Sequence, residues 1–448
     1  VREATRYGDL PEVQWLTYGP GHLHGVRMGG VGLDFERDAL HREVGRRGVL
    51  ADATLGFESR STHDAAGYLI GQQVSVVGDR LIWTRAYRND LTGKVIAIGD
   101  KWAGLNTYRY DPSGRLVGSD LAGRSRNYLF DPAGNRLFGA DSLDIRPETW
   151  PDNRIRRFDD LEYQHDVAGN VIRRVQRKGI TLDFAYDALH RMVHVNRIGM
   201  KNDSTASYVY DAFGRRIRKE VTFTDGEVAV ERFGWDGDRL SARVRGRQQL
   251  TVLYAPGSFV PLLCLTEQTK PEVHFQGLFG EFISRHGLTG CWSPVEPVGI
   301  GMDATAVCCC LGDHLGTPLQ WLDLSGDFKF RGIADDWGGV QGSQGIAPLP
   351  IRFQGQYLDE ESGLYYNRFR YYDPEAGRYL TQDPVGLLGG SNLYVYAENV
   401  PTVQVDAMGL QAFLPGLLGM FGARPGPLLP RVQPPNGAGG AGGRPFGG

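Results

Sequence analysis

The sequence predicts an all-β protein in which hairpins stack side by side into one long sheet. A short motif recurs along the first half of the chain, and each copy contains the residues of a tight turn. Glycine is abundant at 62 residues, and tyrosine and phenylalanine number 20 each, which suits many strands and turns. With 448 residues, of which 23% are charged, the chain is long enough and apolar enough to bury a large core.

The repeat consists of two aromatic residues separated by one other, then Asp, a short spacer, Gly or a substitute, a basic or polar residue and an aliphatic one. Clear copies carry their Asp at positions Asp111, Asp131, Asp166, Asp187 and Asp211, and weaker copies surround Asp38, Asp64, Asp90 and Asp236. Successive copies are mostly 20 to 26 residues apart. This spacing suits two strands of about 6 to 8 residues and two turns per repeat.

The chemistry of one unit explains its shape. The aromatic residues end an incoming strand, Asp and Gly form the turn, and the aliphatic residue that follows starts the returning strand. A single hairpin is unstable in water, but stacked hairpins share hydrogen bonds and bury a common face. Residues 1–250 are therefore predicted to form the repeats, and residues 251–349 to continue the same β-structure.

Residues 251–349 contain the string Asp313-His314-Leu315-Gly316-Thr317-Pro318. Asp313 and His314 resemble a catalytic pair, but adjacent residues on a strand face opposite sides of the sheet. Gly316 and Pro318 instead favour a structural turn. The Gly-rich segment from Trp337 to Pro348 is expected to be an exposed loop.

Residues 350–410 alternate aromatic and polar residues and are expected to contain strands. Three turn signals interrupt them: Asp373-Pro374 with Gly377, Asp383-Pro384 with Gly386, and Asp406 with Gly409. Residues 411–448 include 11 glycines and 7 prolines and no acidic residue. Such a composition cannot build a core, so this segment is predicted to be a tail.

The segment from Arg352 to Leu410 closely resembles the Rhs/YD-repeat-associated core of bacterial polymorphic toxins and of Tc toxin C subunits. The matching strings are Arg352-Phe353-Gln354-Gly355-Gln356-Tyr357, Gly363-Leu364-Tyr365-Tyr366-Asn367-Arg368, Tyr371-Tyr372-Asp373-Pro374, Gly377-Arg378-Tyr379, Asp383-Pro384, Gly389-Gly390 and Asn392-Leu393-Tyr394. With the repeats and the Asp313–Pro318 string, the resemblance covers roughly residues 30 to 410. It implies that the repeats wind into a spiralling sheet that forms part of a hollow shell.

The resemblance also implies a chemistry. Residues 350–410 would be a self-cleavage domain that cuts between Leu410 and Gln411 in the manner of an aspartyl protease, with Asp383 and Asp406 as the two acids. Residues 411–448 would then be a linker or the start of a variable toxin region that the shell encloses. Four further motif positions are interpreted as structural: Pro401, Gly409, Asp373 and Arg378. Judged by spacing alone, both acids would instead be turn caps.

Two departures from the family pattern bear on this activity. Ala407 replaces the usual proline after the second acid, and Val400 replaces the usual asparagine before Pro401. Because proline restricts the backbone, its loss could loosen the site and make cleavage slow or absent. The alternative hypothesis is a non-catalytic β-shell or a cell-surface carbohydrate-binding module, in which exposed Tyr and Trp side chains contact glycans.

Composition limits the partners. A net charge of −3 and a pI near 6.4 argue against nucleic acid as a partner. The five cysteines include the run Cys308-Cys309-Cys310 but no C-x-x-C spacing, so small buried strand residues are expected rather than zinc ligands, and no metal or cofactor is implied. No apolar run is long enough to span a membrane.

The resemblance implies that the partners are the chain's own C-terminal toxin segment, secretion-apparatus proteins and an immunity protein. It also implies a bacterial protein that is made in the cytoplasm and exported or delivered to target cells, by a contact-dependent or type VI route, in interbacterial competition. Because the sequence starts at Val1 rather than Met, it is expected to be part of a longer protein.

Overall fold

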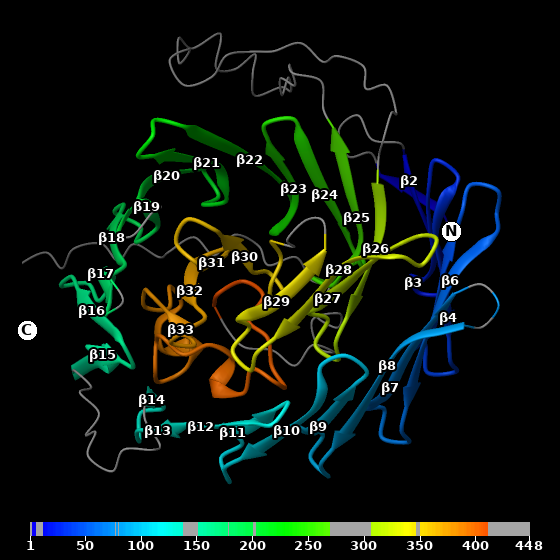
Figure 1. Cartoon of the computed structure of the whole chain (residues 1–448), viewed down its shortest axis with the longest axis horizontal. Coiled ribbons are helices and arrows are strands. Elements are labelled where there is room, and N and C mark those ends of the chain that lie inside the picture. Colours follow the sequence, from blue (N-terminus) through cyan, green and yellow to red (C-terminus); the bar gives the residue numbers. More distant parts are fainter. Residues whose placement is uncertain are drawn as a thin grey trace, which may run out of the picture.

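The computed structural model describes residues 2–5, 12–76, 78, 80–137, 151–177, 179–199, 203–268, 306–345 and 350–410. These residues form strands and turns almost throughout, and each strand pairs antiparallel with its neighbour in the sequence (Figure 1). The predicted all-β fold is confirmed. Among the described residues, no helix is long and apolar enough to cross a membrane.

The first sheet has twelve strands in chain order. They are β1 (Arg2–Thr5), β2 (Val13–Tyr18), β3 (His22–Met28), β4 (Val31–Arg37), β5 (Glu43–Val49), β6 (Leu55–His63), β7 (Leu69–Val76), β8 (Arg80–Asn89), β9 (Val95–Asp100), β10 (Gly104–Tyr110), β11 (Leu116–Leu121) and β12 (Arg124–Asn127). A separate pair, β13 (Leu129–Phe130) and β14 (Arg136–Leu137), follows it.

The second sheet has fifteen strands, again in chain order. They are β15 (Arg157–Phe158), β16 (Leu161–His165), β17 (Val171–Gln176), β18 (Thr181–Tyr186), β19 (Met192–Ile198), β20 (Ser204–Tyr210), β21 (Arg216–Phe223), β22 (Val228–Asp236), β23 (Arg239–Arg245), β24 (Gln248–Tyr254), β25 (Pro261–Gln268), β26 (Ala306–Gly312), β27 (Pro318–Asp323), β28 (Phe328–Ala334) and β29 (Val340–Gly345).

A four-stranded sheet follows, formed by β30 (Tyr357–Asp359), β31 (Leu364–Asn367), β32 (Arg370–Asp373) and β33 (Arg378–Tyr379). Three short 3₁₀ turns complete the described elements: η1 (Pro151–Asn153), η2 (Gly386–Gly389) and η3 (Ala397–Asn399). We call residues 350–410 the closing segment. It lies within the curl of the two large sheets (Figure 1).

The repeat turns adopt the predicted hairpins. In the Asp111 turn, the Asp111 amide donates to the carbonyl of Arg115, and the Gly114 amide donates to the carbonyl of Asp111, each at 2.9 Å. The turns at Asp64, Asp166 and Asp211 repeat this pattern, and so does the turn at Asp313. Each of these turns joins an even-numbered strand to the next strand, so the turns within one sheet all lie at the same ends of the strands. The predicted structural turn at Asp313 is confirmed.

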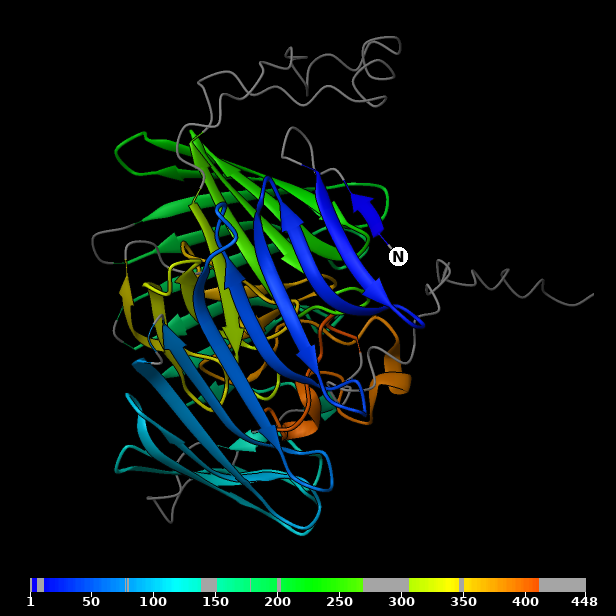
Figure 2. The same cartoon turned by 90° about the vertical axis from the view of Figure 1, so that its right-hand side faces the viewer.

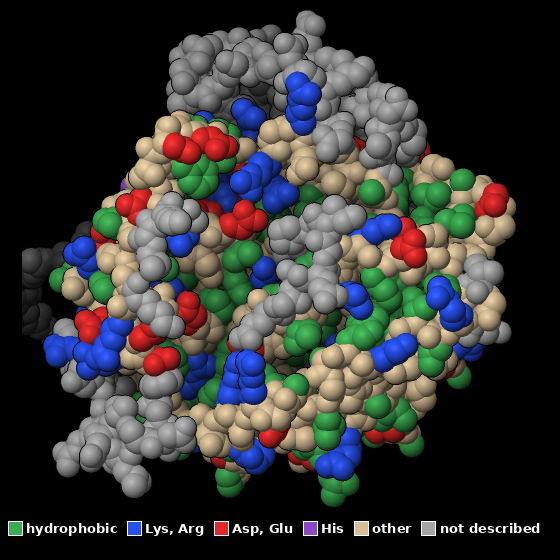
Figure 3. Space-filling view, viewed as in Figure 1, with side chains coloured by type: hydrophobic (Ala, Val, Ile, Leu, Met, Phe, Trp, Pro, Cys, Tyr) green, Lys and Arg blue, Asp and Glu red, His purple; other side chains and the backbone are tan. Residues whose placement is uncertain are grey.

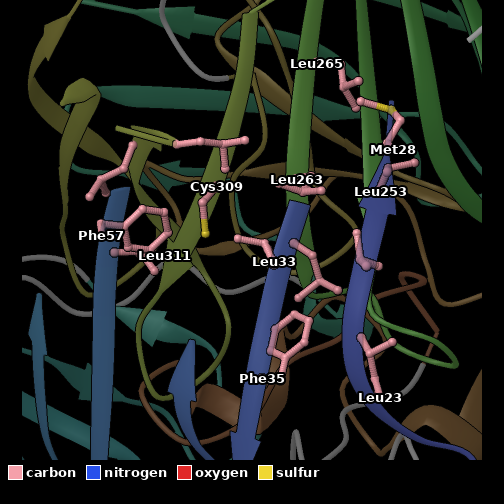
Figure 4. Close-up of a cluster of buried hydrophobic side chains, with 14 of the residues drawn as sticks. Leu23, Met28, Leu33, Phe35, Phe57, Leu253, Leu263, Leu265, Cys309 and Leu311 are labelled. Carbon is pink, nitrogen blue, oxygen red and sulfur yellow. The ribbon is translucent and has the colours of Figure 1, made fainter. Parts of the chain in front are cut away.

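The first sheet packs its face against part of the second (Figures 1 and 2). Leu33 and Phe35 on β4 and Phe57 on β6 meet Leu263 on β25 and Leu311 on β26 (Figure 4). A polar contact also joins the sheets, because Arg46 on β5 donates to the carbonyl of Cys310 at 2.8 Å. Burial of such large apolar side chains stabilises the fold by about 1.5 to 3 kcal/mol each. This core holds the first sheet against the second, so that the chain curls back on itself.

The second sheet is also covered on its other face. Successive cysteines of β26 belong to different cores: Cys309 lies in the core between the sheets, whereas Cys308, Cys310 and the β25 residue Cys264 pack with Ile351 of the closing segment. All four are free and buried. The prediction that the cysteine run fills a strand, with neighbours on opposite faces, is confirmed for these residues.

Two expectations about exposure are wrong for the described residues. Trp337 was expected in an exposed loop, but it is 2% exposed, and β29 begins three residues after it. Trp337 stacks at 4.3 Å from the Arg136 guanidinium, which explains its burial. Large exposed aromatic residues were expected as glycan contacts. Instead Trp15, Trp83 and Trp321 are buried, and among the exposed large side chains the tyrosines are Tyr18 and Tyr68.

Candidate active site

Asp383 and Asp406 each form a turn with one carboxylate oxygen. Oδ1 of Asp383 accepts from the Val385 amide at 3.0 Å, and Oδ1 of Asp406 accepts from the amides of Gly409 and Leu410 at 2.7 and 2.9 Å. Both side chains are nearly buried, at 7% and 2% exposure. The turn-cap interpretation is therefore correct for Oδ1 of each residue, and Oδ2 of each remains available for another role.

Arg370 joins the two carboxylates. Its Nη2 lies 2.9 Å from Oδ2 of Asp383 and 3.2 Å from Oδ2 of Asp406. The arginine is on β32, and its side chain is 2% exposed. Tyr379 on β33 donates a further hydrogen bond to Oδ2 of Asp406 at 2.8 Å, and Asn367 on β31 donates to the Asp406 backbone carbonyl at 2.8 Å. The small sheet thus brings together the two acids that the sequence predicted.

The backbone of Leu410 approaches this pair. A Cβ placed on Gly389 would lie 2.4 Å from Oδ2 of Asp383 and 2.8 Å from the carbonyl oxygen of Leu410. Those two oxygens therefore flank the same small space, which is open because residue 389 has no side chain. The carbonyl of the predicted scissile bond thus lies beside Asp383. Gln411, on the other side of that bond, lies outside the described residues, as does the predicted tail of residues 411–448.

A cavity of about 290 Å³ adjoins the other acid. Its lining includes Asp406, Arg370 and the terminal Leu410 of the described chain. The cavity is polar and large enough for water molecules, which need roughly 30 Å³ each. Asp406 therefore borders a solvent space, whereas Asp383 borders the peptide carbonyl.

The two acids differ in environment. Burial raises the pKa of Asp383 to about 6, and the negative charge of Asp406 adds to this, while the nearby charge of Arg370 opposes it. Oδ1 of Asp406 accepts two backbone hydrogen bonds, and Oδ2 accepts one from Tyr379. Below about pH 6, Asp383 is therefore protonated and can donate a proton.

The four motif positions predicted as structural have contacts of their own in the closing segment. Asp373 is fully buried and pairs with Arg174 of β17 at 2.9 Å. Arg378 donates to the carbonyl of Asn153 at 2.7 Å, and burial lowers the pKa of Arg378 to about 10. Pro401 lines a second cavity beside His314.

Gly409 has φ of +72°, a conformation that a side chain makes costly. A Cβ there would also lie 2.6 Å from the Asn367 carbonyl oxygen. This glycine therefore allows the chain to turn from Asp406 toward Leu410 against β31.

Arg370, Tyr379 and Asn367 were not among the site residues predicted from the sequence. One sequence signal points to the unusual environment of the acids. In six repeat turns, the residue four positions after Asp is Arg or Asn, and its side chain occupies Oδ2 of that Asp; these turns begin at Asp38, Asp111, Asp131, Asp166, Asp187 and Asp211. After Asp383 and Asp406, that position is Leu387 and Leu410. Neither leucine can satisfy Oδ2, so each acid needs another partner.

Comparison with known proteins identifies relatives of the whole described chain. The sequence model of the family described as Teneurin YD-shell matches residues 41–227. Toxin protein Tse5 of Pseudomonas aeruginosa is 40% identical over 95% of this chain and 34% of its own length. Double-stranded DNA deaminase toxin A of Burkholderia cenocepacia is 31% identical over 89% of this chain and 27% of its own length. The chain thus spans about a third or less of the length of these relatives.

Solved structures show the same architecture. A crystal structure of TcdB2-TccC3 superposes with a TM-score of 0.59 at 17% sequence identity, covering 89% of this chain and 22% of that one. At this identity the likeness is one of fold. The sequence matches, together with the repeat turns, show that the chain is a YD-repeat protein of the Rhs type.

Proposed function

We propose that this chain forms the shell around a C-terminal toxin and releases that toxin by cutting itself between Leu410 and Gln411. The observation that carries the proposal is the arrangement of Asp383 and Asp406 on one buried arginine, next to the Leu410 carbonyl. The toxin relatives support the same proposal. Cleavage would occur once per chain, because the protein is its own substrate.

The proposed reaction is hydrolysis by two carboxylic acids. Asp406 takes a proton from a water molecule in the adjoining cavity, and that water attacks the carbonyl carbon of Leu410. Asp383 gives its proton to the carbonyl oxygen, which becomes a hydroxyl in the tetrahedral intermediate. The C–N bond then breaks. The hydroxyl proton returns to Asp383, and the proton held by Asp406 passes to the Gln411 nitrogen, which leaves a carboxyl group on Leu410.

Arg370 would keep the two acids in place during this reaction. Its positive charge compensates the carboxylate charge, so that two acidic groups can remain close in a buried site. Because the chain holds its own scissile bond, no substrate has to be captured, and the gain in effective concentration is worth roughly 7 to 11 kcal/mol in well-oriented systems.

The wider biological role is part of the same proposal. Such a shell would serve interbacterial competition, with the toxin delivered to target cells through a secretion apparatus, possible routes including type VI, and with an immunity protein protecting the producer. The alternative is a container in which both acids serve as turn caps and nothing is cut. The Oδ1 hydrogen bonds of Asp383 and Asp406 would be compatible with this alternative.

The test is the intact mass of the purified chain under denaturing conditions. We expect the wild-type chain to have lost the peptide after Leu410, and Asp383→Asn and Asp406→Asn to remain whole. Asp187→Asn is the matched control, because Asp187 caps a repeat turn in the same way but lies outside the site. This control is expected to be cut like wild type.

Circular dichroism would verify that each variant is folded. A wild-type chain that stays whole would show that it is a container, and equal cleavage of folded Asp406→Asn would exclude the two-acid mechanism.

A further inference from the structure

The wall of the active-site cavity comes from two distant parts of the chain. The closing segment supplies one side, with Asp406 and Leu410. The repeats supply the other, with Arg115 and the turn residues Pro132 to Gly134. The closing segment alone would therefore leave this cavity open to bulk solvent, and the repeat turns complete it.

The same repeat turns hold the strand-free segment that leads to Asp406. Asn399 donates to the carbonyl of Gly134 at 2.8 Å, and Asn392 donates to the carbonyl of Ala133 at 3.0 Å. Tyr394 donates to the carbonyl of Gly169, in a later repeat turn, at 2.8 Å. These acceptors are backbone groups of the turn, so they are in position only when the hairpins have formed.

A second set of contacts holds Thr402, four residues before Asp406. The Tyr110 hydroxyl on β10 lies 2.6 Å from the Val95 carbonyl, to which it donates, and 2.9 Å from the Thr402 hydroxyl. Since Tyr110 has one hydroxyl proton, the Thr402 hydroxyl is the donor in the second bond. From the second sheet, Nε2 of His314 donates to the Thr402 carbonyl at 2.8 Å.

Thr402 is thus held from both large sheets. Tyr110 precedes the Asp111 turn at the end of the first sheet, and His314 belongs to the Asp313 turn of the second. The closing segment lies between these parts of the chain (Figure 1). On the face shown in Figure 3, hydrophobic, basic and acidic side chains are mixed around the centre. The position of Thr402 therefore depends on the curl that brings the two sheets together.

We propose that the repeat turns at Asp111 and Asp131, together with the Asp313 turn, regulate the cleavage site by completing it. This inference rests on the proposed self-cleavage and adds an order of events: the bond after Leu410 is cut only after the sheets have curled around the closing segment. Tyr110 and His314 are positioning residues, because they act on Asp406 through Thr402 and touch no reacting atom. The toxin would consequently stay attached to any shell that has not closed.

The test follows self-cleavage of the full chain during cell-free synthesis, with samples stopped in denaturant and measured by intact mass. Tyr110→Phe and His314→Leu each remove one hydrogen bond to Thr402, and we expect each to lengthen the cleavage half-time at least tenfold. His314→Gln keeps an N–H donor at a similar reach and should restore the half-time to within about threefold of wild type.

Tyr254→Phe is the matched control. The Tyr254 hydroxyl donates to the Leu240 carbonyl of the preceding hairpin at 2.9 Å, as Tyr110 donates to the Val95 carbonyl. Among the described residues, no hydrogen bond joins the Tyr254 hydroxyl to the closing segment. Its half-time should stay within twofold of wild type. If His314→Leu only lowered stability, the chains that do fold would be cut at the normal rate. Slow cleavage of folded His314→Leu and its rescue by His314→Gln would therefore show that His314 positions Thr402.

The outcomes separate this inference from the proposed function. If wild type is cut and Asp406→Asn is whole, but folded Tyr110→Phe and His314→Leu are cut at the wild-type rate, the closing segment is sufficient and the inference is wrong while the proposed function stands. A wild-type chain that remains whole throughout would overturn the proposed function, and the inference with it.

Discussion

Replacement of Asp359 by Asn should destabilise the contact between the closing segment and the second sheet. Asp359 on β30 is fully buried, and both of its oxygens contact Arg216 on β21, the second at 3.0 Å. Lys219 contacts Oδ1 of Asp359 at 3.1 Å. Asn has nearly the same volume as Asp, so the substitution removes the negative charge and leaves little cavity.

The magnitude follows from the burial of the cations. Arg216 is 0% exposed and Lys219 is 3% exposed, so neither can recover hydration when its partner loses its charge. Removing one member of a buried ion pair costs about 3 to 5 kcal/mol. Glu361 and Glu231 still contact Lys219, at 3.1 and 3.3 Å. We therefore expect the loss in the free energy of unfolding to lie near the lower limit of this range. For 448 residues the unfolding entropy is roughly 0.9 kcal/mol/K, so the melting temperature should fall by roughly 3 to 5 °C.

The assay is urea unfolding of both proteins, followed by near-UV circular dichroism, at pH 7 and again near pH 3. Burial alone would raise the pKa of Asp359, but the charges of Arg216 and Lys219 outweigh burial and lower it. A lowered pKa contributes stability above the unfolded value of about 3.9, and that stability is lost as pH falls through the folded value. The difference between the proteins should therefore be large at pH 7 and smaller in acid.

Glu162→Gln breaks an ion pair with Arg157 in which both side chains are about half exposed. Since exposed pairs contribute little, this control should show no resolvable change. An Asp359→Asn protein as stable as the control at pH 7 would refute the reasoning that the buried charges hold the closing segment.

Three further predictions concern the closing segment. Gly389→Ala should abolish self-cleavage in a folded protein, because the added methyl group fills the space between Asp383 and the Leu410 carbonyl. Gly99→Ala, whose Cβ would have no atom within 4 Å, should be cut normally. The intact mass of each variant measures the outcome. The cleavage rate should fall about tenfold per pH unit above about pH 6, where Asp383 loses the proton it donates, and a rate that still rises between pH 6 and 8 would contradict its role as the acid. Gly355→Ala should cost more than about 2 kcal/mol in urea unfolding, because φ is +80° and a Cβ would lie 1.8 Å from the Ala407 carbonyl oxygen.

The repeat region could be predicted from the sequence because each turn depends on residues that are close together in the chain. Each turn is specified by an Asp, a Gly and their neighbours, and the hydrogen bonds of the Asp111 and Asp211 turns are the ones this pattern predicts. The Asp236 copy forms a shorter turn, with Asp236 opposite Arg239, because its glycine directly follows the Asp. The curl of the sheets could not be predicted in this way. It depends on contacts such as Arg46 with Cys310, which are 264 residues apart.

The arrangement of the candidate site could be predicted only in part. The resemblance identified Asp383 and Asp406, but Arg370 lies in a stretch, Arg370–Asp373, in which all four residues are buried. An alternating strand on a half-exposed sheet would place every second residue in water, and the sequence therefore favours an exposed arginine. Burial on both faces arises because β32 lies between the second sheet and the segment that carries Asp406, which is a property of the tertiary fold.

A tertiary contact compensates for the absence of proline at position 407. The substitution was expected to loosen the backbone next to Asp406. Ala407 is 2% exposed, and its carbonyl oxygen lies against Gly355, where no side chain could fit. Packing against Gly355 thus restricts the chain where proline would otherwise have restricted it. The structural reason to expect slow cleavage is therefore weaker than the sequence indicated.

The repeat turns and the candidate site use the two oxygens of an aspartate differently. A repeat Asp uses Oδ1 for its turn and gives Oδ2 to the side chain four residues later, as Asp211 does with Arg215 at 2.7 Å. With leucine at that position, as after Asp383 and Asp406, Oδ2 must find a different partner. Two such carboxylates facing one buried Arg370 create a paired acid site. Replacement of Leu387 by Arg tests this relation. If the new guanidinium pairs with Asp383, the pKa of Asp383 should fall, and the decline in cleavage rate at high pH should begin at a lower pH than in wild type.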